Sequence, residues 1–265
     1  MGKIKRVSCI ATPMLLTVVS LTCFLVVALA QISPGGHSTP LERDLYFFKA
    51  DTSRIMLSPQ SLLDSLPGSV FGIEVPDALQ SVAKSGHLKD FYVVGLFSYC
   101  EGETDTESGK ETVTHCSAWK LPFYFDPVAV WQLENTSVQE ILGEPFAKGL
   151  KMYRKTVEWT HYTFIVVLAL TVLECVTGLL AIRGRGHSLC ATVVSFAQTM
   201  LAIAAAAVAT ITYVTLTGVF ETVLRPYNIE ASLGVRLFSI LWLAVACSIA
   251  SSFFWPLSAC FCSGK

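Results

Sequence analysis

The chain has 265 residues, of which 52% are hydrophobic and 15% are charged, and its mean hydropathy is +0.55. A chain so rich in apolar residues and so poor in charge is not an ordinary soluble protein, which indicates a membrane protein. Its formal net charge is -1, and it has no long basic run. It therefore lacks the electrostatic signature of a nucleic-acid-binding protein, and we expect no nucleic-acid partner.

The amino terminus predicts the first membrane span. Residues 1–6 are short and basic, and residues 7–32 are continuously apolar. A helix crosses a bilayer with about 20 apolar residues, so we expect a cytosolic terminus at 1–6 followed by a first transmembrane helix at 7–32. A cleaved signal peptide is the alternative, because Ala28-Leu29-Ala30 resembles a cleavage site. The length favours the uncleaved helix, since signal peptides carry only about 7 to 15 apolar residues.

Residues 33–158 are polar and contain many turn-forming residues, which predicts one folded extracellular domain. Within it, segments 91–100 and 115–127 are rich in aromatic and β-branched residues and predict two strands joined by a loop over 102–110. Antiparallel pairing would bring Cys100 and Cys116 within the roughly 4.4 to 6.8 Å between Cα atoms that a disulfide requires. Disulfides persist in oxidising compartments, so this domain is expected outside the cytosol.

Two further features of the sequence suggest covalent modification. Asn135-Thr136-Ser137 is an N-glycosylation acceptor triplet, although such triplets also occur by chance. Cys260 and Cys262 follow the last apolar segment, where S-palmitoylation and ordinary interfacial thiols are both reasonable interpretations. The remaining cysteines lie in or beside apolar segments, where a free thiol behaves as a small hydrophobic residue: Cys9, Cys23, Cys175, Cys190 and Cys247.

Three more apolar segments follow the extracellular domain. The expected order is a second span at 159–182, a cytosolic turn at 183–188, a third span at 189–215, a second extracellular loop at 216–234, a fourth span at 235–257 and a cytosolic tail at 258–265. More basic residues flank the predicted cytosolic ends than the second loop, which favours both termini in the cytosol. The predicted fold is a four-transmembrane-helix bundle with a disulfide-stapled, partly β extracellular domain between helices 1 and 2.

Glu174 lies inside the second span, where a carboxylate must face protein, water or a partner. Its depth matches that of Gln198 in the third span, which predicts a hydrogen bond across the helical hairpin. An ion or proton site is the alternative, but a single acid without charged partners in the other spans makes a poor transport pathway. The acidic segment 101–111 lacks the oxygen spacing of a calcium loop, and no phosphate-binding loop or catalytic signature stands out. We expect no cofactor, no metal site and no enzyme activity.

Several segments together resemble a known family. Gly95-Leu96-Phe97-Ser98-Tyr99-Cys100 followed by Cys116, within a four-span chain, is similar to the signature of the claudin superfamily. The chain more specifically resembles the fungal SUR7/PalI family of cortical tetraspan proteins, through segments 94–102, 125–131, 225–234 and 260–264. Phe97 stands where claudins have Trp, so the claudin strand arrangement does not transfer in detail. The long cytosolic tail of the PalI branch is missing, which favours the Sur-Seven branch.

This resemblance implies a plasma-membrane protein of eisosome-associated patches, with roles in cortical organisation, cell-wall integrity and endocytosis. The implied partners are sterol-rich membrane lipid, further copies of the chain through lateral self-association, and BAR-domain scaffold proteins of the eisosome, reached directly or through lipid. Two alternatives remain open. One is a claudin-like regulator of calcium entry or cell fusion, and the other is an accessory protein of ambient-pH signalling.

Overall fold

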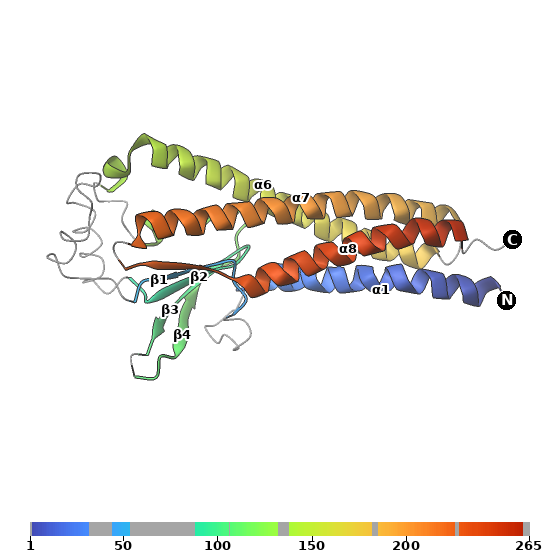
Figure 1. Ribbon diagram of the computed structural model, residues 1–265, viewed down its shortest axis with the longest axis horizontal. Coiled ribbons are helices and arrows are strands. Elements are labelled where there is room, and N and C mark those ends of the chain that lie inside the picture. The colour runs from blue at the N-terminus through green and yellow to red at the C-terminus, as the bar shows by residue number, and fades with distance from the viewer. Residues whose placement is uncertain are drawn as a thin grey trace. The chain divides into compact units, whose positions relative to one another are not determined.

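The computed structural model describes residues 2–31, 44–53, 88–105, 107–131, 138–181, 185–225 and 228–261 (Figure 1). The chain divides into two compact units. The helical unit comprises Met1–Leu29, Trp159–Thr210 and Arg236–Lys265, and the sheet unit comprises Ala30–Glu158 and Ile211–Val235.

Four long helices provide the membrane spans: α1 (Gly2–Leu29), α6 (Val138–Ala181), α7 (Arg185–Val223) and α8 (Val235–Phe261). Each contains an apolar stretch long enough to cross a bilayer. Within the helical unit these helices run side by side, and α1 begins at the same end of the bundle at which α8 ends (Figure 1). The predicted four-transmembrane-helix fold is confirmed. Two of the helices are longer than the predicted spans, because α6 begins at Val138 and α7 continues to Val223.

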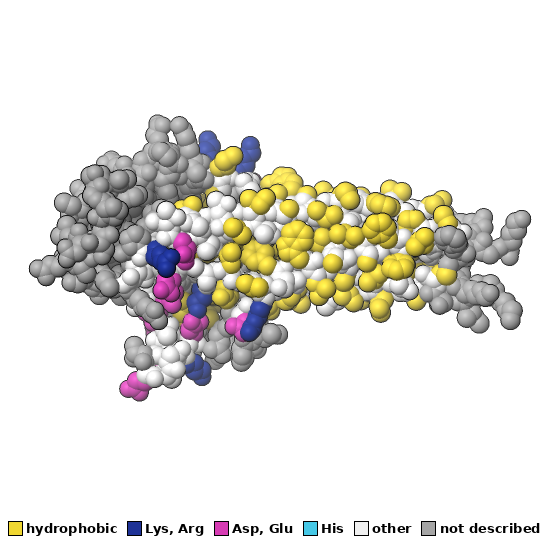
Figure 2. All heavy atoms as spheres, viewed as in Figure 1, with side chains coloured by type: hydrophobic (Ala, Val, Ile, Leu, Met, Phe, Trp, Pro, Cys, Tyr) yellow, Lys and Arg dark blue, Asp and Glu magenta, His cyan; other side chains and the backbone are white. Residues whose placement is uncertain are grey.

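The outer surface of the helical unit is apolar. Leu15, Val193 and Phe253 each expose about two thirds of their side chains. Figure 2 shows many hydrophobic side chains along the helices of this unit, whereas charged side chains are seen over the sheet and over the first part of α6. Such a continuous apolar surface is unfavourable in water and favourable in lipid, as expected for a multi-pass membrane protein.

Small residues allow the helices to approach closely. A Cβ atom at Gly178 of α6 would lie 2.3 Å from the Met14 sulfur and 2.9 Å from the Trp255 ring, so α1 and α8 occupy the space that a side chain would need. Small residues on α7 and α8 are also buried, at Ala202, Ala206 and Ala244. Close approach of this kind is a main source of helix association in lipid.

The sheet unit contains a five-stranded antiparallel sheet in the order β4-β3-β2-β1-β5. Its strands are β1 (Phe48–Asp51), β2 (Phe91–Val94), β3 (Tyr99–Thr104), β4 (Glu111–Cys116) and β5 (Glu230–Leu233), and a short helix α5 (Pro127–Val130) follows β4. The sheet lies between the first and second membrane spans in sequence except for β5, which comes from the segment before α8. The predicted partly β domain is thereby confirmed.

The strand boundaries differ from those predicted. The predicted strand over 91–100 is two strands, because the chain reverses at Gly95, whose N–H donates to Ser98 O at 2.9 Å. The second predicted strand ends at Cys116, and the following residues lead without regular structure to α5. The segments that form β1 and β5 were predicted as parts of an extracellular domain and a loop, not as strands.

Both faces of the sheet are covered by packed side chains. One face carries Phe48 and Tyr92, whose rings contact Phe125. Trp131 and Phe220 extend this aromatic cluster from α5's end and from α7. The opposite face carries a cluster of Phe91, Val93, Cys100 and Val113. Burial of large aromatic rings contributes about 1.5–3 kcal/mol for each side chain, so this core stabilises a small sheet well beyond strand pairing alone.

Candidate functional site

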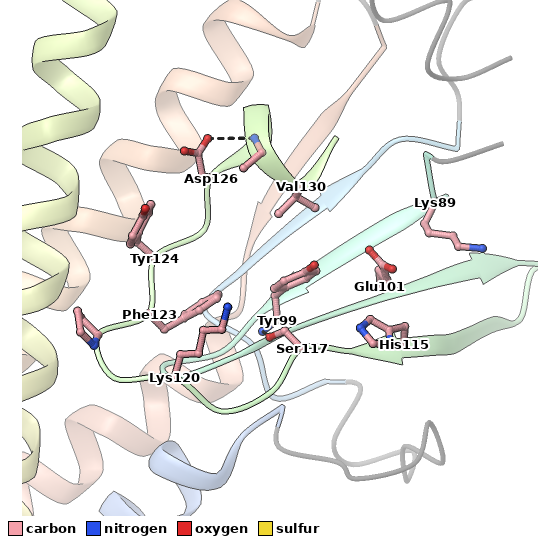
Figure 3. Close-up of a pocket in the computed structure, with 12 residues that line it drawn as sticks. Lys89, Tyr99, Glu101, His115, Ser117, Lys120, Phe123, Tyr124, Asp126 and Val130 are labelled. Carbon is pink, nitrogen blue, oxygen red and sulfur yellow. Dashed lines mark hydrogen bonds between the residues drawn. The ribbon is translucent and has the colours of Figure 1, made fainter. Parts of the chain in front are cut away.

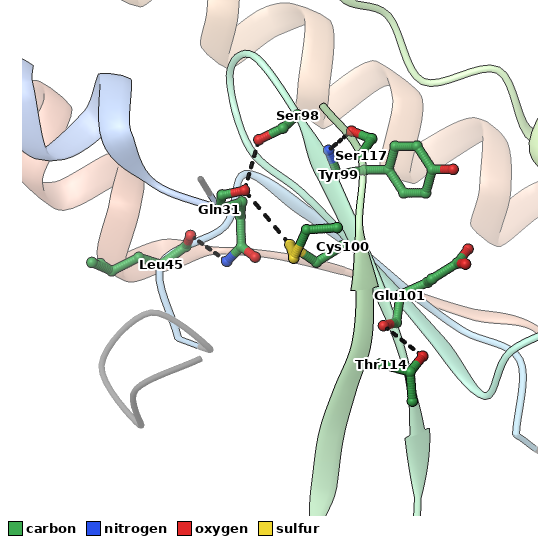
Figure 4. The surroundings of a disulfide bond; sticks show 9 residues. Gln31, Leu45, Ser98, Tyr99, Cys100, Glu101, Thr114 and Ser117 are labelled. Carbon is green, nitrogen blue, oxygen red and sulfur yellow. Dashed lines mark hydrogen bonds between the residues drawn. A yellow bond between two sulfur atoms is a disulfide. The ribbon is translucent and has the colours of Figure 1, made fainter. Parts of the chain in front are cut away.

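The disulfide between Cys100 and Cys116 joins β3 to β4 (Figure 4). The two residues are directly opposite in the strand register, and their Cα atoms are 4.0 Å apart. That spacing is somewhat shorter than the roughly 4.5 Å of a non-hydrogen-bonded antiparallel pair, which is the closer of the two kinds of pair in an antiparallel ladder. The next pair is held by hydrogen bonds from Ser117 N to Tyr99 O and from Tyr99 N to Ser117 Oγ. The predicted disulfide is confirmed, at the edge of the sheet.

Gly95 of the recognised motif lies where the backbone leaves no room for a side chain. A Cβ atom there would be 2.7 Å from the carbonyl oxygen of Ala30. The carbonyl oxygen of Gly95 accepts a hydrogen bond from the Tyr213 hydroxyl at 3.3 Å. A glycine is therefore required because the β2–β3 turn packs directly against the chain that follows α1.

The rest of the motif anchors this same turn. Leu96 and Phe97 are both buried, and the Phe97 ring packs on Trp119 with a centroid distance of 5.4 Å. The hydroxyl of Ser98 donates to the carbonyl oxygen of Gln31 at 2.7 Å, as Figure 4 shows. A polar side chain buried at this depth needs such a partner, so the motif binds the turn to Gln31, in the chain that follows α1.

Gln31 is the hydrogen-bond partner of Ser98 in the motif. It is buried and adopts a positive φ of 65°. Its side-chain amide donates to the Leu45 carbonyl at 2.8 Å. The Cys100 sulfur lies 3.6 Å from the Gln31 carbonyl oxygen, a contact without a hydrogen bond because a disulfide sulfur carries no proton. The turn, the disulfide and the chain after α1 thus form one packed corner, which we call the disulfide corner (residues 30–31, 45, 95–100 and 116–119).

A groove of about 650 Å³ lies beside this corner (Figure 3). The strands and their ends contribute Lys89, Tyr99, Glu101, His115 and Ser117 to its lining. The segment after the disulfide contributes Lys120, Pro122, Phe123, Tyr124, Asp126, Ala129 and Val130. Tyr99 and Glu101 share one face of β3, because alternate residues of a strand point to the same side. The groove was not predicted from the sequence.

The positions of the groove's side chains are fixed by specific contacts. The Tyr99 and Phe123 rings stack at a centroid distance of 6.2 Å and an interplanar angle of 18°. The Arg154 guanidinium lies 4.5 Å from the centroid of the Tyr124 ring. Asp126 precedes α5, and its carboxylate accepts from Ala129 N at 3.4 Å, as a helix-capping residue does. The three aromatic side chains and Asp126 are therefore held in place without a ligand.

The charges of the groove are not all neutralised by neighbours. Lys89 pairs with Glu103 at 2.6 Å, and this hydrogen bond raises the pKa of Lys89. Half-burial raises the pKa of the Glu101 carboxyl, while the nearby His115 and Lys89 lower it to a smaller extent. Burial also raises the pKa of Tyr99. Among the described residues, no side chain donates a hydrogen bond to the Glu101 carboxylate.

Inside the helical unit, Glu174 is fully buried and accepts three hydrogen bonds at Oε1. The donors are the Thr17 hydroxyl at 2.9 Å, the Ser251 hydroxyl at 2.9 Å and the Trp255 indole at 2.8 Å. Thr17 and Ser251 also lie 2.9 Å apart. This cluster therefore links α1, α6 and α8 through one carboxylate oxygen.

Gln198 belongs to a second cluster, one helical turn away. Its amide donates to the hydroxyls of Thr171 and Ser248, both at 3.1 Å. Ser248 is 2.7 Å from Ser20, so all four helices meet in this layer. The predicted hydrogen bond between Glu174 and Gln198 is wrong, because each side chain uses other partners. The competing partners, which the prediction did not consider, are threonine, serine and tryptophan side chains of the neighbouring helices.

The other predicted sites are described only in part. Asn135 and Cys262 lie outside the described residues. Cys260 is a free, exposed cysteine near the end of α8, and acylation there stays a prediction. Cys9 was expected to be a free thiol, but it is disulfide-bonded in the structure. Within the described part of the chain, no group of three or more His, Cys, Asp and Glu residues is arranged to hold a metal ion.

Comparison with known proteins agrees with this architecture. Residues 9–254 match the model of the SUR7/PalI family. The chain is 24% identical over 224 residues to the SUR7 family protein pun1 of Schizosaccharomyces pombe, and the alignment covers 77% of this chain and 76% of that protein. No solved structure matched the chain significantly. Since the family match extends over the spans, the motif, the disulfide and β5, this chain belongs to the SUR7/PalI family.

Proposed function

We propose that the chain is a tetraspan scaffold of eisosome-type microdomains in the plasma membrane, where it organises the cell cortex and contributes to cell-wall integrity and endocytosis. The observation that carries the proposal is membership of the SUR7/PalI family over residues 9–254. The four spans and the disulfide fit a secreted-pathway membrane protein.

The buried polar clusters of the bundle support a scaffold over a conducting protein. Glu174 is occupied by three donors, and Gln198 by two acceptors, all from neighbouring helices. Polar groups that satisfy one another join helices in lipid, whereas a transport pathway needs groups that exchange partners with an ion or water. The bundle is thus suited to a fixed shape with an apolar exterior for lateral contacts with sterol-rich lipid and with other copies.

In this proposal the sheet unit lies outside the plasma membrane and both termini lie in the cytosol. The even number of spans and the excess of basic residues at the predicted inner ends support that orientation. The connection between α6 and α7 is short and would lie in the cytosol, so BAR-domain scaffold proteins would act on this chain partly through shared lipid. The membrane span and the wall-facing sheet would then be coupled in one cortical patch.

The proposal is tested by imaging a carboxyl-terminally tagged copy beside a marker of the eisosome scaffold, together with a deletion strain. We expect the two signals to coincide in cortical patches, and we expect deletion to raise sensitivity to cell-wall stress while calcium uptake stays unchanged. A diffuse or internal signal would contradict the scaffold. Altered calcium uptake would favour the regulator of calcium entry, and loss of alkaline-pH signalling would favour the pH-signalling accessory protein.

A further inference from the structure

We propose that the groove beside the disulfide corner binds an uncharged polysaccharide chain. This inference deepens the proposed function and rests on it only for the expectation that the sheet unit faces the cell wall. The groove's volume of about 650 Å³ lies within the roughly 300 to 1,000 Å³ of typical ligand sites. Its lining is more polar than that of a typical drug-like site, which favours a ligand with many hydroxyl groups.

The aromatic side chains give the groove flat apolar surfaces beside polar groups. Tyr99 and Tyr124 are both half-buried and come from different segments of the lining, and in Figure 3 the Phe123 ring lies between them. A pyranose ring has an apolar C–H face and a polar rim of hydroxyls. Tyrosine suits such a ligand because its ring offers an apolar surface and its hydroxyl a hydrogen-bonding group.

The charges of the lining favour a neutral ligand. Glu101 and Asp126 are matched by Lys89 and Lys120, so neither sign dominates the groove. A strongly acidic or basic polymer would meet like charges at one wall, and that repulsion opposes binding. An uncharged sugar chain, in contrast, offers donors to the carboxylates and acceptors to the lysines.

Glu101 is the groove residue that a ligand with hydrogen-bond donors would stabilise most. It lies half-buried in the groove, and no described side chain donates a hydrogen bond to its carboxylate. The raised pKa of this carboxyl reflects the unfavourable burial of its charge. Half-buried charged groups without a hydrogen-bond partner often occur in binding sites, because the ligand supplies the missing partner. Sugar hydroxyls are donors of the required kind.

The position of the groove argues against an extended peptide as the ligand. Peptides that add to a sheet pair with the backbone of an edge strand. Tyr99 and Glu101 belong to β3, whose two sides are already paired with β2 and β4. The groove therefore offers side chains of a sheet face and not an open strand edge.

The test uses the purified full-length chain in lipid nanodiscs, titrated calorimetrically with three neutral hexasaccharides: β-1,3-linked glucose, β-1,4-linked N-acetylglucosamine and α-1,6-linked mannose. We expect saturable binding of at least one. Glu101→Gln should weaken it about tenfold, as expected for loss of one charge-assisted hydrogen bond, and Lys120→Met should weaken it less. Glu107→Gln, at the exposed β3–β4 turn outside the groove, is the matched control and should bind as the wild type does.

Two results would overturn the inference. One is the failure of the wild-type chain to bind any of the three hexasaccharides. The other is equal binding by Glu101→Gln, Lys120→Met and the wild type, which would place the sugar elsewhere. Circular dichroism and thermal unfolding of each variant establish that it is folded. The outcome is independent of the scaffold proposal. Sugar binding without cortical patches would contradict only the scaffold proposal, and cortical patches without sugar binding would contradict only the proposed ligand of the groove.

Discussion

The helical unit and the sheet unit hold their interiors together with different side chains. In the helical unit, buried Thr17, Ser248, Ser251 and Gln198 join helices to one another and to Glu174 by hydrogen bonds. In the sheet unit, buried aromatic rings such as Tyr92 and Phe125 provide most of the contact. Apolar side chains are as favourable in lipid as inside a protein, so helices in lipid associate through close packing and polar contacts. A domain in water, in contrast, gains most of its stability from burying apolar rings.

The largest expected effect concerns the disulfide between Cys100 and Cys116, which lies within the sheet unit. Cys100→Ser and Cys116→Ser should each destabilise that unit by about 2–5 kcal/mol, and the double variant should be no worse than either single one, because each removes the same bond. Misfolding should retain the variants in the secretory pathway, which surface labelling of tagged copies measures.

The control for the cysteine variants is Cys190→Ser, which replaces a free, exposed cysteine on α7. It should reach the surface at the wild-type level. Normal surface levels of Cys100→Ser would show that the sheet unit does not depend on this disulfide.

The next effect is steric. At Gly234 a Cβ atom would lie 1.5 Å from the carbonyl oxygen of Tyr46, so Gly234→Ala should displace the end of β5 and cost about 3 kcal/mol. Gly218→Ala on α7 is the matched control, since nothing lies within 4 Å of its added Cβ. It should stabilise the helix by about 0.5–1 kcal/mol. Thermal unfolding of both purified variants tests this, and equal changes in stability would contradict the close approach of Gly234 to Tyr46.

A smaller effect is expected in the helical unit. Glu174→Ala removes the acceptor of three hydrogen bonds and should cost about 2 kcal/mol, since bonds between helices in lipid contribute about 0.6 kcal/mol each. Glu174→Gln keeps an oxygen at that place and should cost less. Unfolding in mixed detergent micelles compares them. Identical stability of Glu174→Ala and wild type would mean that close packing alone holds the bundle.

The smallest effect depends on pH and concerns Glu101. Burial raises the pKa of Glu101 in the folded state above its value in the unfolded chain. The contribution of Glu101 to the free energy of unfolding is therefore fully present below the unfolded-state pKa and is lost as pH rises through the folded-state pKa. Glu101→Gln should therefore be more stable than the wild type at about pH 7, by less than about 1 kcal/mol, and equally stable at about pH 3.5. Melting temperatures at both pH values check this, and a difference that persists at low pH would assign the effect to packing.

The sequence is sufficient to predict the spans and the disulfide because their signals are local. Runs of apolar residues define the helices, and Cys100 and Cys116 stand on either side of one acidic turn. Neither prediction requires knowledge of residues far away in the chain. The composition of the apolar segments therefore predicts the four-helix fold, and the spacing of Cys100 and Cys116 predicts the disulfide.

The sheet order and the groove depend on long-range contacts that no local pattern reveals. β5 pairs with β1 across the sequence, between Leu233 and Phe48. The available signal was the alternation of polar and apolar residues over Glu230–Leu233. Four residues are too few to distinguish a strand from a loop. The groove forms only when the segment 120–130 folds beside β3. Glu174 was expected to face protein, water or a partner, and its hydrogen-bond donors come from α1 and α8.

The measurement that tests the scaffold account most directly is fluorescence recovery after photobleaching of the tagged chain in living cells. A scaffold component held in a patch should show little recovery over minutes. Complete recovery within seconds, as for a freely diffusing tetraspan protein, would contradict the account.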